Sequence, residues 1–299
     1  MNTSSFVVAI KRYYLLTKPG IVYANLFTAA AGFFLASKGA MHVLLFLNTL
    51  AGICLLIAGA CVVNNYTDIV IDAKMDRTKS RALVIKSIPT AHALIFAAML
   101  TLIGSFLLIH FVNSLTFLLG FTAVLDYVVL YAWGKRHTIH GTLIGTLAGA
   151  LPPVAGYTAA ANRLDVWSLL LFLFLVFWQM PHFYAIAIYR LKDYRAAKLP
   201  VLPAIKGLAA TKKQMLFYSL LTMCTLFLFP LTRAAGITFF IGMGIPTSYW
   251  VLFIAKGFKV QESELWSKKV FLFSLIIIIL FSVLIPLDSV LRYGLTIMW

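Results

Sequence analysis

Residues 43–81 read VLLFLNTLAGICLLIAGACVVNNYTDIVIDAKMDRTKSR, an apolar run that passes directly into a charged loop. The run over 43–63 is long enough for a bilayer-spanning helix, which needs about 20 apolar residues. The loop places Asp68, Asp72 and Asp76 four residues apart. Carboxylates at this spacing share one helix face and repel one another, so the pattern indicates a bound cation. Mg²⁺ suits such oxygen ligands and commonly bridges them to a phosphorylated ligand.

Apolar runs of similar length recur along the whole chain. Hydrophobic residues make up 62% of the sequence and charged residues only 11%, well below the charged content of soluble domains. We therefore predict an all-α, polytopic membrane protein that forms one domain over residues 1–299, a bundle of nine transmembrane helices. The predicted spans are residues 17–37, 43–63, 90–111, 114–133, 141–161, 166–189, 214–232, 234–255 and 270–287.

The basic residues are distributed unevenly between the two ends of these spans. The net charge is +16, but all except four of the 25 Lys and Arg residues fall in the N-terminal segment or in even-numbered loops. The exceptions are Lys38, Arg163, Arg233 and Arg292. This positive-inside pattern places the N-terminus in the cytoplasm and argues against nucleic acid as a partner. With no cleavable signal peptide evident, we expect a bacterial inner membrane.

Two loops on the predicted cytoplasmic side are longer and more polar than the rest. They cover about residues 64–89 and 189–213, and we interpret them as the active loops. The second loop has a single acid, Asp193, among several basic residues.

Several ordered segments carry a family resemblance. Besides the acidic loop they are TKPGIVYANL (17–26), RTKSRAL (77–83), KRHTIHGTLIG (135–145), GALPPVAGY (149–157), FWQMPHFYAIAIYRLKDY (177–194) and LPVLP (199–203). They resemble the protohaem IX farnesyltransferase (haem O synthase) family of the intramembrane aromatic prenyltransferase superfamily, which includes 4-hydroxybenzoate polyprenyltransferase. The resemblance implies nine transmembrane helices. It also implies transfer of farnesyl from farnesyl diphosphate to a vinyl group of haem B, with addition of water, to give haem O for haem–copper terminal oxidases.

The chain departs from this family in the acidic loop. The family usually has Arg-Asp directly after the first motif aspartate, where this chain has Ile69 and Val70. One charge pair is missing, so we expect weaker phosphate binding or reduced activity.

The resemblance assigns roles to the polar residues, and the chemistry agrees with it. An allylic diphosphate ionises only if the growing charge on the leaving group is neutralised. We expect Asn64, Asp68 and Asp72 to be catalytic and to hold Mg²⁺, and Asp193 to hold a second ion, with Asp76 as a surface partner of a neighbouring base. The expected diphosphate ligands are Arg77, Lys79, Arg81, Lys135 and Arg136.

Haem contacts are predicted from intramembrane polar residues. His182 follows Pro181 inside a span, and a neutral imidazole is a common axial ligand of haem iron. The alternative for His182 is a hydrogen bond between helices. His137 and His140 are placed to meet the haem propionates. Further expected cavity-lining residues are Asn25, Trp178 and Gln179, although each amide could instead join two helices. The lone intramembrane acid Asp126 has no assignable partner.

Two other functions stay open on the sequence. A related prenyltransferase could use a quinone precursor, although segments 135–145 and 177–194 argue against this. A non-enzymatic transporter or haem-binding membrane protein would also have basic loops and intramembrane polar residues. It would not need the Asn64, Asp68 and Asp72 spacing opposite Asp193.

Overall fold

Long apolar helices make up most of the computed structural model, which describes residues 3–298. Within this range nine helices are long and apolar enough to cross a membrane, so the predicted number is confirmed. The nine spans are Pro19–Ser37 (α2), Val43–Thr67 (α3), Thr90–Phe111 (α5), Ser114–His137 (α6 Ser114–Leu125, η1 Asp126–Leu130 and α7 Tyr131–His137), Gly141–Ala161 (α8), Val166–Tyr189 (α9), Gly207–Leu231 (α12), Ile237–Lys259 (α13 Ile237–Lys256 and η2 Gly257–Lys259) and Ser263–Tyr293 (α14).

Some helices extend beyond the predicted spans. α12 begins at Gly207 instead of residue 214, and α14 runs over Ser263–Tyr293 instead of 270–287. Hydropathy detects only the apolar part of a helix. The helix itself continues through polar turns at its ends, which a hydropathy pattern does not include. The short helices were not predicted, and they are α1 (Thr3–Leu16), α4 (Ile69–Asp72), α10 (Leu191–Ala196) and α11 (Leu202–Ile205).

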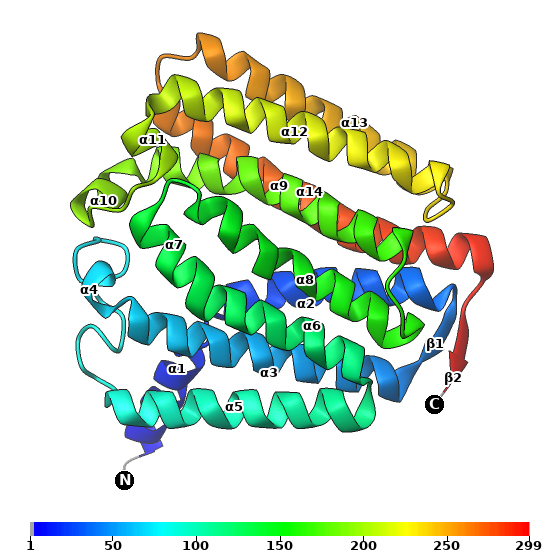
Figure 1. Ribbon diagram of the computed structural model, residues 1–299, viewed down its shortest axis with the longest axis horizontal. Coiled ribbons are helices and arrows are strands. Elements are labelled where there is room, and N and C mark those ends of the chain that lie inside the picture. The colour runs from blue at the N-terminus through cyan, green and yellow to red at the C-terminus, as the bar shows by residue number, and fades with distance from the viewer. Residues whose placement is uncertain (1–2, 299) are drawn as a thin grey trace.

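The spans lie side by side, from α12 and α13 at one edge to α5 at the other (Figure 1). α2 packs against α8 and against α14, so the first and last spans are neighbours. The loops carrying α4 and α10 lie at the same end of the bundle (Figure 1), and Met75 from one packs with Ala197 and Leu199 from the other. The predicted active loops are therefore in contact.

The contact between α2 and α8 depends on glycine. A β-carbon added at Gly32 would overlap the carbonyl oxygen of Pro153, and one at Gly156 would overlap the carbonyl oxygen of Ala29. Small residues allow transmembrane helices to approach this closely.

A small sheet lies at the end of the bundle opposite the active loops. β1 (Ala40–His42) pairs in parallel with β2 (Thr296–Met298), with Ala40 opposite Thr296 (Figure 1). The all-α prediction missed these strands because three residues are too few to show an alternating pattern.

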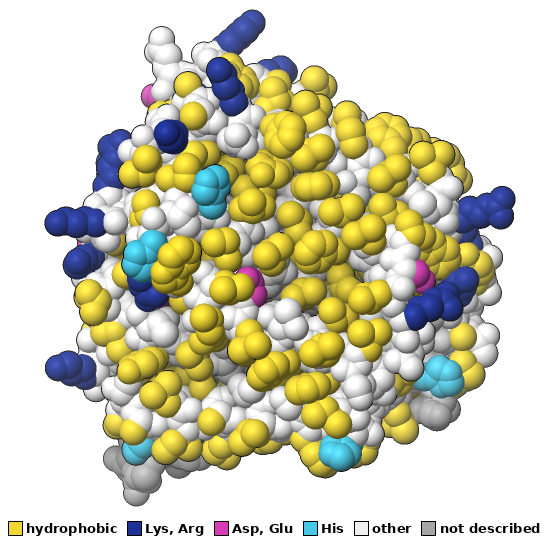
Figure 2. Space-filling model, viewed as in Figure 1, with side chains coloured by type: hydrophobic (Ala, Val, Ile, Leu, Met, Phe, Trp, Pro, Cys, Tyr) yellow, Lys and Arg dark blue, Asp and Glu magenta, His cyan; other side chains and the backbone are white. Residues whose placement is uncertain are grey.

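The surface agrees with a membrane-embedded bundle. Figure 2 shows hydrophobic side chains across the middle of one face, with Lys and Arg gathered towards the ends and most of them at the active-loop end.

Asp126 begins a π-helical turn, η1 (Asp126–Leu130), in the middle of the fourth span. Its Oδ2 accepts a hydrogen bond of 3.0 Å from the backbone N–H of Ala148 on α8. The partner that the sequence could not identify is thus a backbone group. Its other oxygen, Oδ1, is buried and has no hydrogen-bond partner among the described residues.

Candidate active site

The end of α3 brings two carboxylates into a buried position. Asp68 is the C-cap of α3, and Asp72 closes the single turn of α4. Asp68 is 7% exposed and Asp72 only 2% exposed. Asp76 instead lies at the surface, where it forms a 2.7 Å ion pair with Lys79. Of the three acids in the loop, only the first two can act inside the protein.

Basic side chains neutralise both buried carboxylates. Lys135 from α7 lies 2.5 Å from one oxygen of Asp68, and Arg136 lies 3.0 Å from the other. Arg81 lies 2.5 Å from Asp72. These pairs explain how the chain holds two like charges four residues apart in a buried site.

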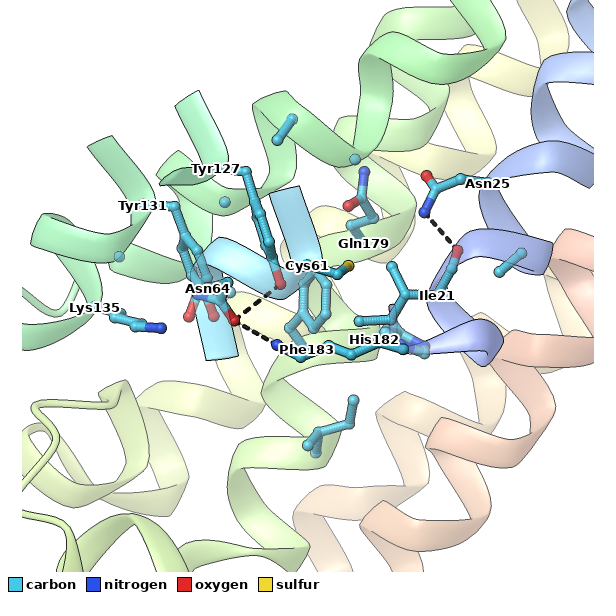
Figure 3. A pocket seen from close by; sticks show the side chains of 18 of the residues that line it. Ile21, Asn25, Cys61, Asn64, Tyr127, Tyr131, Lys135, Gln179, His182 and Phe183 are labelled. Carbon is cyan, nitrogen blue, oxygen red and sulfur yellow. Dashed lines mark hydrogen bonds between the residues drawn. The ribbon is translucent and has the colours of Figure 1, made fainter. Parts of the chain in front are cut away.

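Asn64 lies one helical turn before Asp68 and joins three elements. Its Oδ1 accepts hydrogen bonds from Nζ of Lys18 and from the hydroxyl of Tyr127, the latter at 3.3 Å (Figure 3). Its Nδ2 is buried and has no hydrogen-bond partner among the described residues. Burial lowers the pKa of Lys18 to about 8. Lys18 has a left-handed backbone, with φ of 53°, directly before Pro19.

These groups form the polar head of a cavity of about 650 Å³. The cavity extends between the helices, where its wall is largely apolar and includes Ile53, Leu56, Ile57, Val124 and Ile278. A polar head that continues into an apolar interior matches an amphiphile with a charged group at one end.

Four predicted residues of the membrane interior lie on the same cavity wall: Asn25, Trp178, Gln179 and His182. Figure 3 shows His182 and Gln179 from α9, with Asn25 from α2 nearby. The amide of Asn25 donates to Ile21 O at 2.8 Å, and that of Gln179 donates to Leu175 O at 3.0 Å and Thr146 O at 3.2 Å. The Gln179 bond to Thr146 links α9 with α8, as the alternative interpretation expected.

Among the expected diphosphate ligands, Arg77, Arg81 and Lys135 line the cavity. Lys79 is instead exposed and pairs with Asp76. Arg136 lies behind Asp68, where it also donates to Thr67 O at 2.6 Å and braces the end of α3.

Three other predicted residues lie off the cavity wall. Asp193 is half-buried on α10, and it is the next residue, Tyr194, that lines the cavity. His137 is exposed, stacks on Trp133 and bonds through Nδ1 to Trp133 O at 2.8 Å. His140 is exposed at the start of α8. All three lie at or near a helix end, and spacing along the sequence does not indicate which side of a helix end faces the cavity.

Ile69 and Val70, which replace the charge pair usual in the resembling family, also lie off the wall. Val70 is 69% exposed, and Ile69 packs in an apolar cluster with Val62. The positions that lack the expected charges are therefore not in contact with the cavity.

Other cavity residues were missed as site residues. The charge pattern explains Lys18 and Arg190 only as topological charges, whereas both line the cavity. The guanidinium of Arg190 lies over the ring of Tyr189, 4.9 Å from its centroid, and its Nε is buried without a hydrogen-bond partner in the described range. Tyr127 and Tyr131, which stack on each other, gave no sequence signal beyond aromatic composition.

The oxygen donors fit Mg²⁺ only in combination with a substrate. Among residues 3–298, no group of three or more His, Cys, Asp or Glu side chains could hold a metal ion. Mg²⁺ is usually held by one or two carboxylates together with substrate phosphates and water. Asp68 and Asp72, with Asn64 beside them and cations around them, match this arrangement.

The sequence model described as the UbiA prenyltransferase family matches residues 25–276. The chain belongs to this family. It is a prenyltransferase, and the resemblance found in the sequence is confirmed.

The chain is also similar to curated proteins that share one name within this family. The chain is 43% identical over 284 residues to the protoheme IX farnesyltransferase of Protochlamydia amoebophila, covering 94% of this chain and 99% of the relative. It is 42% identical over 280 residues to the protoheme IX farnesyltransferase of Edwardsiella ictaluri, covering 93% and 95%.

Solved structures share the fold at lower identity. A digeranylgeranylglyceryl phosphate synthase superimposes with a TM-score of 0.78 at 20% identity, over 94% of this chain and 98% of the other. A UbiA homologue from Archaeoglobus fulgidus bound to GPP and Mg²⁺ superimposes with a TM-score of 0.69 at 16% identity, over 92% and 99%.

Proposed function

We propose that this prenyltransferase transfers the farnesyl group of farnesyl diphosphate to a vinyl group of haem B, with addition of water, giving haem O and diphosphate. The observation that carries the proposal is the cavity itself. It joins two buried, cation-paired carboxylates to an apolar interior in a chain whose relatives are named protoheme IX farnesyltransferase.

The polar head is assigned to the diphosphate. Arg77, Arg81 and Lys135 provide cations along its wall, and Asp68 and Asp72 provide carboxylates. Mg²⁺ bound with the substrate would neutralise charge on the leaving group. As the substrate docks, Lys135 and Arg81 exchange part of their pairing with the carboxylates for contacts to phosphate oxygens.

The apolar interior is assigned to the farnesyl tail. Side chains such as Ile53, Leu56 and Val124 surround the tail and keep water away from the allylic carbon. The faces of Trp178 and Phe183, also on the wall, stabilise positive charge on this carbon through cation–π contact.

The haem side of the reaction needs no protein nucleophile. The bond between the allylic carbon and the diphosphate oxygen breaks, and the haem vinyl group forms the new carbon–carbon bond. Water adds to the resulting cation on the haem side chain and loses a proton, which leaves a hydroxyl group. His182 is assigned to the haem iron, because a neutral imidazole on the cavity wall suits axial ligation.

The protein is a multi-pass membrane protein. We further propose that the active loops face the cytoplasm of a bacterial inner membrane, and that haem–copper terminal oxidases receive the product. The excess of Lys and Arg at the active-loop end supports this orientation.

Haem extraction tests the function directly. Membranes from cells that make the chain should yield a more hydrophobic, farnesylated haem, and membranes that lack it should not. Asp72→Asn should abolish the new haem, whereas the exposed Asp76→Asn should preserve it. A membrane that contains the protein, haem B and farnesyl diphosphate but yields only haem B would overturn the proposal.

A further inference from the structure

The inference concerns Ser274 of α14 and rests on the proposed function. Ser274 is fully buried, and its hydroxyl lies 2.7 Å from Nδ1 of His182. Its backbone carbonyl accepts a 3.1 Å hydrogen bond from the indole N–H of Trp178. One residue of α14 thus holds two side chains that are one turn apart on α9.

The hydroxyl of Ser274 has a second neighbour, which decides the direction of its bond to His182. It lies 2.6 Å from the carbonyl oxygen of Phe271. A carbonyl can only accept, so the single hydroxyl hydrogen points to Phe271. The hydroxyl oxygen is then free to accept a hydrogen bond from Nδ1–H of His182.

This direction leaves the lone pair of His182 on its other nitrogen. A neutral imidazole carries one hydrogen, so a protonated Nδ1 makes Nε2 the electron-pair donor. In the described part of the chain, Nε2 has no hydrogen-bond partner, and His182 lines the cavity. The ring is also held by stacking on Trp178, with centroids 5.0 Å apart, and by contact with Phe271 at 5.0 Å.

We propose that Ser274 is a positioning residue for haem, which fixes the tautomer and orientation of His182 so that Nε2 is presented to the iron. Metal-bound histidines generally donate their other N–H to a neighbouring acceptor, and loss of that acceptor typically weakens metal binding about 10–100-fold. An uncharged hydroxyl serves this purpose in the membrane interior without the cost of burying a carboxylate.

The test uses the full chain in detergent, titrated with haem B. Ser274→Ala should bind haem about 10–100-fold more weakly than the parent. At saturating haem it should still show a histidine-ligated Soret spectrum, but with a lower iron–histidine stretching frequency in the ferrous state, because the ring loses its acceptor. Ser274→Thr retains the hydroxyl and should restore both properties, and His182→Ala should lose the histidine-ligated spectrum.

Ser267→Ala is the matched control. Ser267 is also fully buried on α14 and also bonds to the carbonyl three residues before it, Glu264, at 2.9 Å. No other side chain bonds to its hydroxyl among residues 3–298, so its removal should leave haem binding and the stretching frequency unchanged. Mg²⁺-dependent binding of farnesyl diphosphate confirms that every variant is folded.

The outcomes separate this inference from the proposed function. If Ser274→Ala matches the parent in haem affinity and stretching frequency while the parent makes farnesylated haem, only the inference is overturned. An equal loss in Ser267→Ala and Ser274→Ala would also overturn it, since the effect would then be one of helix packing. A parent that binds no haem would overturn both.

Discussion

Asp68 and Asp72 are buried, whereas Asp76, four residues further on, is at the surface. The spacing in the sequence is the same for both steps, so it could not distinguish a site residue from a solvated one. The difference arises because α4 ends at Asp72 and the chain continues in turns, where Met75 packs inward and Asp76 faces outward. Burial thus identifies Asp68 and Asp72 as site residues and Asp76 as a surface residue.

We expect Asp68→Asn and Asp72→Asn each to lower turnover by at least about 10²-fold, because loss of a metal-binding carboxylate costs several kcal/mol in the transition state. Asp76→Asn should change turnover by less than about twofold, since exposed ion pairs contribute little. The measurement is haem O formation by protein quantified in the membrane. Near-parental turnover of Asp68→Asn and Asp72→Asn would rule out their role at the metal.

Lys18 provides a pH-dependent contact at the polar head. Burial lowers its pKa to about 8, so in the ligand-free enzyme it is charged below this pH and neutral above it. The affinity for farnesyl diphosphate should therefore fall as the pH rises through 8. Lys18→Arg should remove this dependence, since arginine stays charged. Lys18→Met should weaken binding by roughly 10–100-fold at pH 7, the range for losing a charged hydrogen bond.

Isothermal titration calorimetry with farnesyl diphosphate across pH 6.5–9.5 would measure these affinities. An identical pH profile in the parent and in Lys18→Arg would show that another group causes the dependence. Lys79→Met is the control, because Lys79 is exposed and pairs only with Asp76.

The helices themselves were largely predictable, because each long apolar run must satisfy its backbone within the membrane. The side that each helix turns towards the protein interior was not predictable. In α2, α3 and α5 the apolar residues are spread around the whole helix, so apart from a few polar residues such as Asn25 and Asn64 little in their sequences distinguishes the lipid side from the protein side. The close packing of α2 on α8 follows from glycines whose importance appears only when the neighbouring backbone is known.

This packing leads to a stability prediction. Gly156→Ala should lower the free energy of unfolding by about 1–3 kcal/mol, the usual cost of overpacking, because the new methyl group meets the backbone of Ala29. Gly244→Ala on α13 is the control, since an added β-carbon there has no neighbour within 4 Å. Thermal unfolding in detergent should show a lower midpoint for the first variant only. Equal midpoints would indicate that α2 and α8 can separate without cost.

At the scale of the whole molecule, the charge pattern predicts the orientation of the bundle. Ser80 and Ala209 are exposed, one in each active loop. Single cysteines there, in a background without Cys54, Cys61 and Cys224, should resist a membrane-impermeant thiol reagent in intact cells. They should react once the membrane is opened. Labelling of either position in intact cells would place the loops on the opposite side.

The chemistry of the cavity was predictable from the sequence, but most of the residues that line it were not. The spacing of Asn64, Asp68 and Asp72 and the intramembrane position of His182 pointed to it. The contributions of Lys18, Tyr127 and Arg190 come from chain segments far apart in sequence, and only the folded bundle brings them to the cavity. The same is true of Ser274, which a sequence shows only as one serine in an apolar helix.

The neighbouring positions of α2 and α14 have a consequence for biogenesis. Lys18, Ile21 and Asn25 contribute one part of the cavity wall, while Phe271, Leu275 and Ile278 contribute another. The first group is inserted at the start of translation and the second near its end. A nascent chain with eight spans in the membrane therefore still has an incomplete pocket. Haem and its prenyl donor can be enclosed together only after the ribosome has delivered the ninth span.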